Sequence, residues 1–180
     1  MNHPRRLRRR QIVALATGAL LTAGLALAAP GSAAANTAAG TTRAQAQTQT
    51  PLVVNARWGG HCTFDRIVID LQGYVPGYTV TPVPQLYYDG SGHPVPLAGK
   101  YFLEIRLNPA AAHTEEGQNV YQGPRLQKIY LSKLKGIAFT GDYEGYVTFG
   151  AAFDTKPAYS TMVLHAPERL VVDIAHPNVC

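Results

Sequence analysis

Apolar and polar residues alternate in short runs from about residue 52 onward, and glycine, proline and aspartate separate the runs. A period of two is the pattern of a strand with one buried face, and the separating residues favour turns. Only Arg125–Leu134 fits a helix, and a short one. This spacing predicts an all-β fold, either a β-sandwich or a partly closed barrel. The predicted strands are Leu52–Trp58, Phe64–Gln72, Tyr78–Tyr88, Lys100–Leu107, Tyr143–Phe153, Ala158–Ala166 and Glu168–Ala175.

Two of these strands repeat almost the same heptamer, DRIVIDL at residues 65–71 and ERLVVDI at residues 168–174. In each copy one face is apolar, and the other carries an arginine, a valine and an aspartate. Antiparallel pairing with Val68 opposite Val171 brings opposite charges together, whereas parallel pairing of the repeats would place like charges side by side. The alternative is that the two strands occupy equivalent places in opposing sheets. The predicted charge pairs are Arg66 with Asp173 and Asp70 with Arg169.

The N-terminal region, residues 1–35, has the features of a secretory signal peptide. Five arginines precede an apolar run at residues 12–29, and small residues suited to cleavage follow. The run is rich in alanine and ends at Pro30, which favours cleavage over the alternative of a retained membrane anchor. The arginine cluster leaves both Sec and twin-arginine export open. Because no cysteine lies near the cleavage region, we expect a secreted or wall-associated protein and not a lipoprotein.

Removal of the signal peptide changes the charge of the protein. Its five arginines account for the whole excess of 16 basic over 11 acidic side chains, so the mature protein is formally neutral. Net charge therefore gives no support for binding to nucleic acid or to an anionic membrane. Residues 36–51 contain no large apolar side chain and are predicted to form a flexible tether. Residues 52–180 have a usual size for one domain with a single core.

Cys62 and Cys180 are the only cysteines in the chain. One lies near the start of the predicted domain and the other is the last residue, which suits a disulfide in an oxidising compartment better than a metal site. Closing so long a loop would contribute on the order of 4 to 5 kcal/mol. The antiparallel register of the repeats places Cys62 opposite Pro177, close to Cys180. Two free thiols are the alternative.

Candidates for catalysis and for metal binding are weak. None of the serines that follow the signal peptide lies in a G-x-S-x-G motif. His113, Glu115 and Glu116 could gather a metal, but no H-E-x-x-H spacing is present, so neither a metal nor another cofactor is predicted. Asp142 and Glu144 could hydrolyse a glycosidic bond if they were held at the right separation, although acidic residues are common beside turn glycines. No catalytic residue is therefore predicted.

Aromatic residues give the clearest indication of a binding function. Tyrosines near strand ends can stack on sugar faces while their hydroxyls remain hydrated, although sandwiches also bury aromatic residues in the core. Arginines can hold a carboxylate of a wall peptide with paired hydrogen bonds. The candidate binding residues are Arg57, Trp58, Tyr74, Tyr78, Tyr87, Tyr88, Tyr143 and Tyr146.

The sequence also resembles a known family. The terminal ERLVVDIAHP is similar to the closing strand of AMIN domains, and the ordered strings FDRIVID, PGY, GSG, PLAG, AHT, GDYEG, VTFG and ERLVVD resemble the AMIN-like domain of exported bacterial proteins. The resemblance covers about residues 53–174. It implies an antiparallel, jelly-roll-like β-sandwich that, in cell-wall amidases and secretin systems, targets proteins to peptidoglycan or envelope assemblies without catalysis of its own. No ligand residue of the family is carried over.

Together these features predict an exported, non-catalytic module that binds peptidoglycan or another cell-wall polymer. We expect no catalytic or pore-forming domain after the last strand, so binding would be the whole function. The alternative is a protein-interaction module of an envelope assembly, in which an exposed sheet edge accepts a partner strand. A cell-wall hydrolase built on Asp142 and Glu144 is less favoured. We expect neither nucleic-acid binding nor a membrane span in the mature form.

Overall fold

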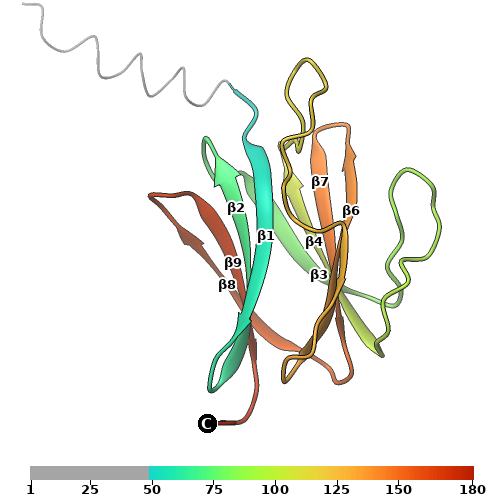
Figure 1. Ribbon diagram of the computed structural model, residues 1–180, viewed down its shortest axis with the longest axis vertical. Coiled ribbons are helices and arrows are strands. Elements are labelled where there is room, and N and C mark those ends of the chain that lie inside the picture. Colours follow the sequence, from blue (N-terminus) through green and yellow to red (C-terminus); the bar gives the residue numbers. More distant parts are fainter. Residues whose placement is uncertain (1–48) are drawn as a thin grey trace, which may run out of the picture. The chain divides into compact units, whose positions relative to one another are not determined.

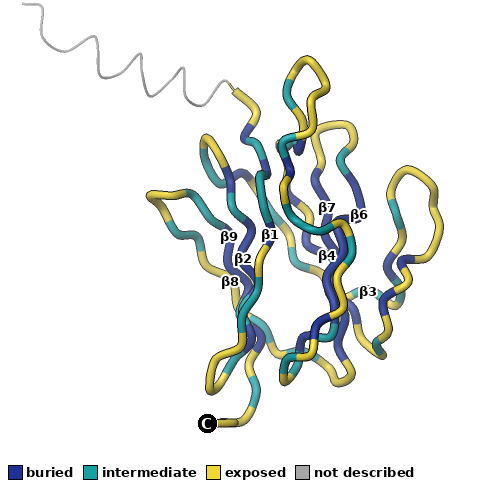
Figure 2. Tube along the Cα trace, viewed as in Figure 1, coloured by how far each residue is buried: buried dark blue, intermediate teal, exposed yellow. Residues whose placement is uncertain are grey.

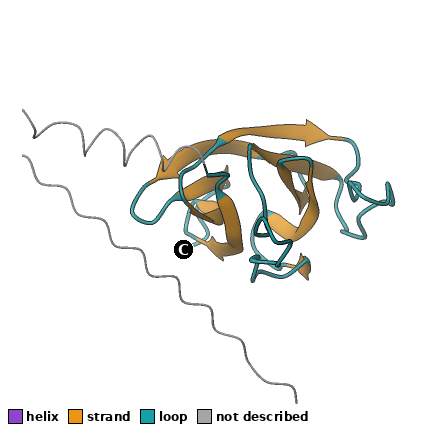
Figure 3. Cartoon of the chain, turned by 90° about the horizontal axis from the view of Figure 1, so that it is seen from above, coloured by secondary structure: helices purple, strands orange, loops and turns teal. Residues whose placement is uncertain are grey.

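The computed structural model describes residues 49–180 (Figure 1). The predicted signal peptide, residues 1–35, and residues 36–48 of the predicted tether lie outside the described residues. Residues 49–180 contain no helix (Figure 3). The strands are β1 (Leu52–Gly60), β2 (Phe64–Gln72), β3 (Gly77–Val83), β4 (Tyr101–Asn108), β5 (Leu126–Lys128), β6 (Leu134–Tyr143), β7 (Tyr146–Phe153), β8 (Ala158–Leu164) and β9 (Arg169–Ala175).

The strands form two antiparallel sheets, which confirms the predicted β-sandwich. The four-stranded sheet has the order β1-β2-β9-β8, and the five-stranded sheet has the order β3-β4-β7-β6-β5. The first two and the last two strands of the chain therefore share one sheet, and the middle of the chain builds the other. Figure 1 shows the two sheets as separate layers, with β1, β2, β9 and β8 on one side and β4, β7 and β6 on the other.

The repeated heptamers pair with each other in the predicted register. β2 and β9 are antiparallel neighbours, with Val68 opposite Val171 and Arg66 opposite Asp173. The Arg66 guanidinium donates two hydrogen bonds of 2.7 Å to the Asp173 carboxylate. These bonds raise the pKa of Arg66 above its usual value. The alternative of equivalent places in opposing sheets is wrong.

The second predicted charge pair differs from the structure. Asp70 lies opposite Arg169 in the register, but its carboxylate accepts hydrogen bonds of 2.8 and 2.9 Å from Arg57 on the neighbouring strand β1. Arg169 instead donates to the carbonyl of Pro167. An antiparallel sheet offers each interior strand two flanking partners, and Arg57 presents its planar donor pair to both carboxylate oxygens.

Three predicted elements need correction, and one strand was not predicted. The predicted strand Tyr143–Phe153 runs through a turn, because Tyr143 ends β6 and β7 begins at Tyr146. Arg125–Leu134 is not a helix, because its first residues form the short strand β5 against β6. Strand β6 itself was missed, since residues 136–141 are buried without interruption and the alternation of polar positions is lost (Figure 2). The predicted strand Tyr78–Tyr88 is too long, and β3 ends at Val83, directly before Pro84. Proline cannot donate a ladder hydrogen bond and is disfavoured inside strands.

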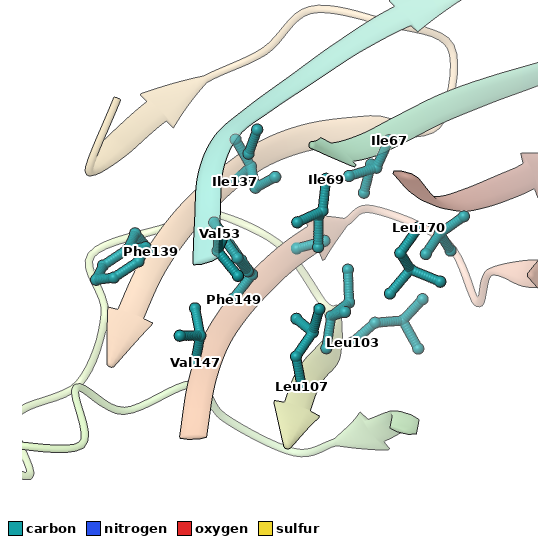
Figure 4. Packing of buried hydrophobic residues seen from close by; sticks show 14 of the residues in the cluster. Val53, Ile67, Ile69, Leu103, Leu107, Ile137, Phe139, Val147, Phe149 and Leu170 are labelled. Carbon is teal, nitrogen blue, oxygen red and sulfur yellow. The ribbon is translucent and has the colours of Figure 1, made fainter. Parts of the chain in front are cut away.

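The core lies between the two sheets. Ile67 and Ile69 of β2, Leu170 of β9, and Leu103 and Phe149 of the five-stranded sheet are all 0% exposed. Figure 4 shows these side chains directed toward one another from both layers. The inward face of β2 is the apolar face that the heptamer pattern predicts. A side chain of this size contributes about 1.5 to 3 kcal/mol on burial.

The predicted disulfide between Cys62 and Cys180 is present, with their Cα atoms 5.1 Å apart. It joins the turn between β1 and β2 to the segment that follows β9. The amide of Val179 also donates to the carbonyl of Cys62, and the amide of His176 donates to the carbonyl of Thr63. The last residues of the chain are therefore attached to the turn between β1 and β2 by covalent and hydrogen bonds.

A loop of residues 84–99, here called the flap, covers part of the outer face of the five-stranded sheet. Its residue Leu86 packs in a second apolar cluster with Phe102 and Ala152 of that face. The flap lies close to the sheet at Gly150, where a Cβ atom would be 2.5 Å from the Leu86 side chain. The rest of the outer face, toward the hairpin between β6 and β7, is not part of this cluster.

The phenol of Tyr121 is expected to titrate well above the usual pKa of a tyrosine. Its ring is 5% exposed and stacks on Phe139, with centroids 4.7 Å apart, and burial raises its pKa to about 12. An unfolded tyrosine loses its proton near pH 10. The contribution of Tyr121 to stability is therefore complete below about pH 10 and is lost as the pH rises toward 12. Phenolate absorbance should show one late step that Tyr121→Phe removes. A titration of the folded protein without this step would contradict the expectation.

Candidate functional site

Two of the predicted binding tyrosines lie together on the outer face of the five-stranded sheet. Tyr143 at the end of β6 is directly opposite Tyr146 at the start of β7. Opposite residues of an antiparallel pair point to the same face, and Val147, the next residue of β7, points into the core. The tyrosines are 66% and 41% exposed, so much of each ring is accessible. Between them Glu144 and Gly145 have φ of 49° and 77° and form the tight turn that joins the strands.

Strand β4 places an ion pair beside these tyrosines. The Arg106 guanidinium lies 5.5 Å from the centre of the Tyr146 ring, within the range of a cation–π contact. Its Nη2 atom is 3.5 Å from Oε1 of Glu104, two residues earlier on the same face. These side chains are 45% and 30% exposed, so a ligand could reach both charges. The arrangement therefore offers a flat aromatic surface and groups of both charges within one part of the sheet.

Thr148 lies at the centre of this part of the sheet. It is opposite Arg106 of β4 on one side and Gly141 of β6 on the other. It is fully buried, and its hydroxyl oxygen has no hydrogen-bond partner within residues 49–180. The Asp89 carboxylate of the flap occupies the space that a side chain at position 141 would need. We call the surface formed by Glu104, Arg106, Tyr143 and Tyr146 the tyrosine face; Thr148 lies buried beneath it, and Asp89 lies on its border.

The other predicted binding residues do not join the tyrosine face. Tyr87 and Tyr88 belong to the flap, where Tyr87 is 52% exposed and Tyr88 packs on the second apolar cluster. Arg57 lies on the outer face of the four-stranded sheet and donates a hydrogen bond to Asp70. The remaining three are half-buried: Trp58 and Tyr78 pack against the main core, and Tyr74 lies in the turn between β2 and β3.

The acidic residues considered for catalysis lie at the end of the sandwich beside the β6–β7 turn. His113 Nδ1 is 2.6 Å from a carboxylate oxygen of Asp142, whose neighbour in the register, Val147, faces the core. Glu144 projects from the turn. An open groove of about 600 Å³ lies next to it, lined by His113, Glu115, Glu116, Glu144 and the backbone near residues 49–52. A hydrogen bond from Thr114 lowers the pKa of Glu116, and its carboxylate is ionised at neutral pH.

Within residues 49–180, no three His, Cys, Asp or Glu side chains are arranged to hold a metal ion. The Asp142 carboxylate is hydrogen-bonded to His113 and lies on the opposite side of the sheet from the tyrosine face, whereas Glu144 projects from the β6–β7 turn. Residues 49–180 also contain no helix that is long and apolar enough to cross a membrane.

Sequence reasoning missed Arg106, Glu104, Thr148 and Asp89. The first two alternate with core residues in KYFLEIRL, so the pattern does place them on the outward face of their strand. What the pattern cannot show is that β4 lies next to β7, which brings Arg106 to Tyr146. Thr148 could not have been found, because its burial depends on the neighbouring strands and not on its own segment.

The described domain is an all-β sandwich of two sheets, with a polar and aromatic face left open on one of them. The family model described as the AMIN-like domain matches residues 51–176, well over half of the chain. The protein therefore belongs to the AMIN-like domain family. No curated protein and no solved structure matches the chain. Such domains are typically non-catalytic, and no catalytic domain is identified; the family and the disulfide both fit an exported protein.

Proposed function

We propose that the protein is a non-catalytic module that binds a polymer of the bacterial cell wall, with peptidoglycan the best candidate, through the tyrosine face. The AMIN-like family supports a role in binding at the cell envelope. The choice of a polymer ligand rests on the adjacent tyrosines Tyr143 and Tyr146, with the Arg106 guanidinium over the Tyr146 ring.

The chemistry of the tyrosine face suits a glycan strand that carries peptides. A sugar ring has an apolar C–H face that can stack on an exposed tyrosine, while the phenol hydroxyl remains hydrated. Arg106 supplies a planar set of donors that fits a carboxylate in two parallel hydrogen bonds, and Glu104 and Asp89 can accept hydrogen bonds from sugar hydroxyls or amides. Because a sheet face is nearly flat, several units of an extended polymer could lie across it.

The proposal also assigns a role to the rest of the chain. Residues 1–35 act as a cleaved export signal, and residues 36–51 act as a tether that lets the domain of residues 52–180 reach its polymer. The lack of large apolar side chains supports the tether. The folded domain begins near the end of the tether, because the carbonyl of Pro51 accepts a hydrogen bond from the amide of Ala111. The protein then works outside the cytoplasm, either secreted or associated with the wall.

Alanine substitution of both Tyr143 and Tyr146 is expected to weaken binding to the cell wall. The measurement is co-sedimentation of the exported, disulfide-bonded protein with peptidoglycan sacculi, before and after covalently attached wall polymers are stripped. Each stacked ring should contribute about 1 kcal/mol, so the double variant should bind roughly thirtyfold more weakly. Pelleting by the unsubstituted protein should be saturable and should survive stripping, which would identify peptidoglycan itself as the ligand.

Tyr130 provides a matched control, because it is 91% exposed in the turn between β5 and β6, away from the tyrosine face. Tyr130→Ala should pellet like the unsubstituted protein. If the control and the double variant lost the same amount of binding, the tyrosine face would not be the binding site. If the protein remains in the supernatant with both preparations of sacculi, the polymer-binding function is wrong.

A further inference from the structure

Three of the four sheet edges are protected against pairing with another strand. Strand β5 has only three residues, and β3 contains Pro82, which has no N–H to donate. The start of the β1 edge is covered by the chain that passes over it, because the amide of Val53 donates to Ala111 and the carbonyl of Val54 accepts from Gln122, each at 2.8 Å. Short length, proline and a covering segment are the usual means by which proteins prevent association at sheet edges.

Strand β8 is the fourth edge, and it has none of these protections. Its seven residues, AYSTMVL, include no proline and no charged residue. It pairs with β9 in one uninterrupted register from Ala158 to Leu164, so no bulge turns the edge away. Among the backbone hydrogen bonds of residues 49–180, none joins β8 to any strand or loop other than β9. Alternate N–H and C=O groups of β8 therefore point outward without a protein partner.

The side chains of β8 leave this edge accessible. The inward residues reach toward β3, where the Tyr159 hydroxyl donates to the carbonyl of Val80 at 2.9 Å and Thr161 lies 3.3 Å from the hydroxyl of Tyr78. These hydrogen bonds attach β8 to β3 through β8 side chains, so they do not use the backbone groups of β8. Ser160 and Met162 lie on the outer face of the sheet, and Met162 is 38% exposed. The strand is thus uncharged and open along its length.

We propose that β8 pairs antiparallel with β8 of a second copy of this chain, about a two-fold axis that joins two four-stranded sheets into one sheet of eight strands. A two-fold contact is closed, so it satisfies both edges at once and stops at a dimer. Pairing an uncharged strand with itself places no like charges opposite each other. The antiparallel direction also brings Lys156, before β8, toward the partner's β8–β9 turn, which carries Glu168.

The dimer does not depend on the ligand of the tyrosine face, which belongs to the other sheet. It is measured by analytical ultracentrifugation of the purified, disulfide-bonded protein over a wide range of concentration. Unsubstituted protein should show a reversible monomer–dimer equilibrium. Met162→Lys should weaken the dimer at least about tenfold, since two-fold pairing brings the added lysines of both copies close together. Tyr130→Lys adds the same charge at a distant exposed position and should leave the equilibrium unchanged.

Ser160→Lys provides a second test on the same outer face, and circular dichroism and thermal unfolding would verify that each variant remains folded. Hydrogen exchange should show alternate amides of β8 slowing as the dimer forms. A protein that remains monomeric at all concentrations would overturn the proposal. A dimer that tolerates lysine at both positions would overturn it equally, because the contact would then lie elsewhere.

Discussion

Replacing Cys62 and Cys180 together with serine is expected to lower the free energy of unfolding by about 4 to 5 kcal/mol in the chain-entropy model. The disulfide closes a loop with a sequence separation of 118, so breaking it restores much conformational freedom to the unfolded chain. The measurement is urea unfolding of the oxidised protein, the reduced protein and the double variant. Changing both cysteines avoids a single free thiol that could crosslink two molecules.

The reduced protein and the double variant should unfold at nearly the same urea concentration, well below that of the oxidised protein. Agreement between them would separate the loss of the covalent bond from any effect of the serine side chains. If all three proteins unfolded together, the disulfide would contribute nothing. The hydrogen bonds of His176 and Val179 to the β1–β2 turn would then be sufficient to hold the end of the chain.

Asp65→Ala is expected to lower the free energy of unfolding by about 3 to 5 kcal/mol, although it changes only one side chain. The Asp65 carboxylate is 1% exposed, and one of its oxygens accepts hydrogen bonds from the amides of Lys133 and Leu134 at 2.6 and 2.9 Å. Alanine leaves both donors unpaired at the start of β6, and a buried donor without a partner costs about 1 to 3 kcal/mol. Urea unfolding again gives the measurement.

The second oxygen of Asp65 adds to this cost. It lies 3.4 Å from Nε2 of His176, whose side chain is also 1% exposed, and neither atom has another hydrogen-bond partner within residues 49–180. Removing the carboxylate therefore leaves the imidazole buried beside an empty space. Asp65→Asn retains an acceptor for the two amides and should cost clearly less than alanine. Equal costs would show that the backbone hydrogen bonds are not the main contribution.

The pairing of β2 with β9 could be predicted from the sequence because the two heptamers carry complementary charges in only one direction. The partner of Asp70 could not be predicted in the same way. A sheet gives each interior strand two neighbours, and nothing in the heptamer indicates that Arg57 of β1 is the better placed donor. The same limit applies to the tyrosine face, where the local sequence predicts neither the hairpin of β6 and β7 nor the neighbouring strand that brings Arg106.

The burial of Asp65 could have been predicted from the strand pattern of the sequence. The alternation that places Ile67 and Ile69 toward the core also places Asp65 on that face, two residues earlier. A charged residue in the inward phase of a strand indicates a buried polar contact. Its partners, however, come from the β5–β6 turn and from the residue after β9, so only the three-dimensional fold could identify them.

Strand β6 was missed for a related reason. Amphipathic alternation requires one face in water, and β6 is covered by the other sheet on one side and by the flap on the other (Figure 2). Strands that are buried on both faces read as short apolar runs, which a helix can also produce. The glycines at positions 136 and 141, where the flap lies close to β6, interrupt the run further.

Binding of a cell-wall polymer to the tyrosine face can be mapped residue by residue with NMR. The isotope-labelled protein would be titrated with soluble glycan-peptide fragments released from peptidoglycan, and the shifts of the backbone amides recorded. We predict saturable shifts that cluster around Glu104, Arg106 and the β6–β7 hairpin from Gly141 to Thr148. No shifts at saturating fragment concentrations, or shifts confined to the outer face of the four-stranded sheet, would contradict the account.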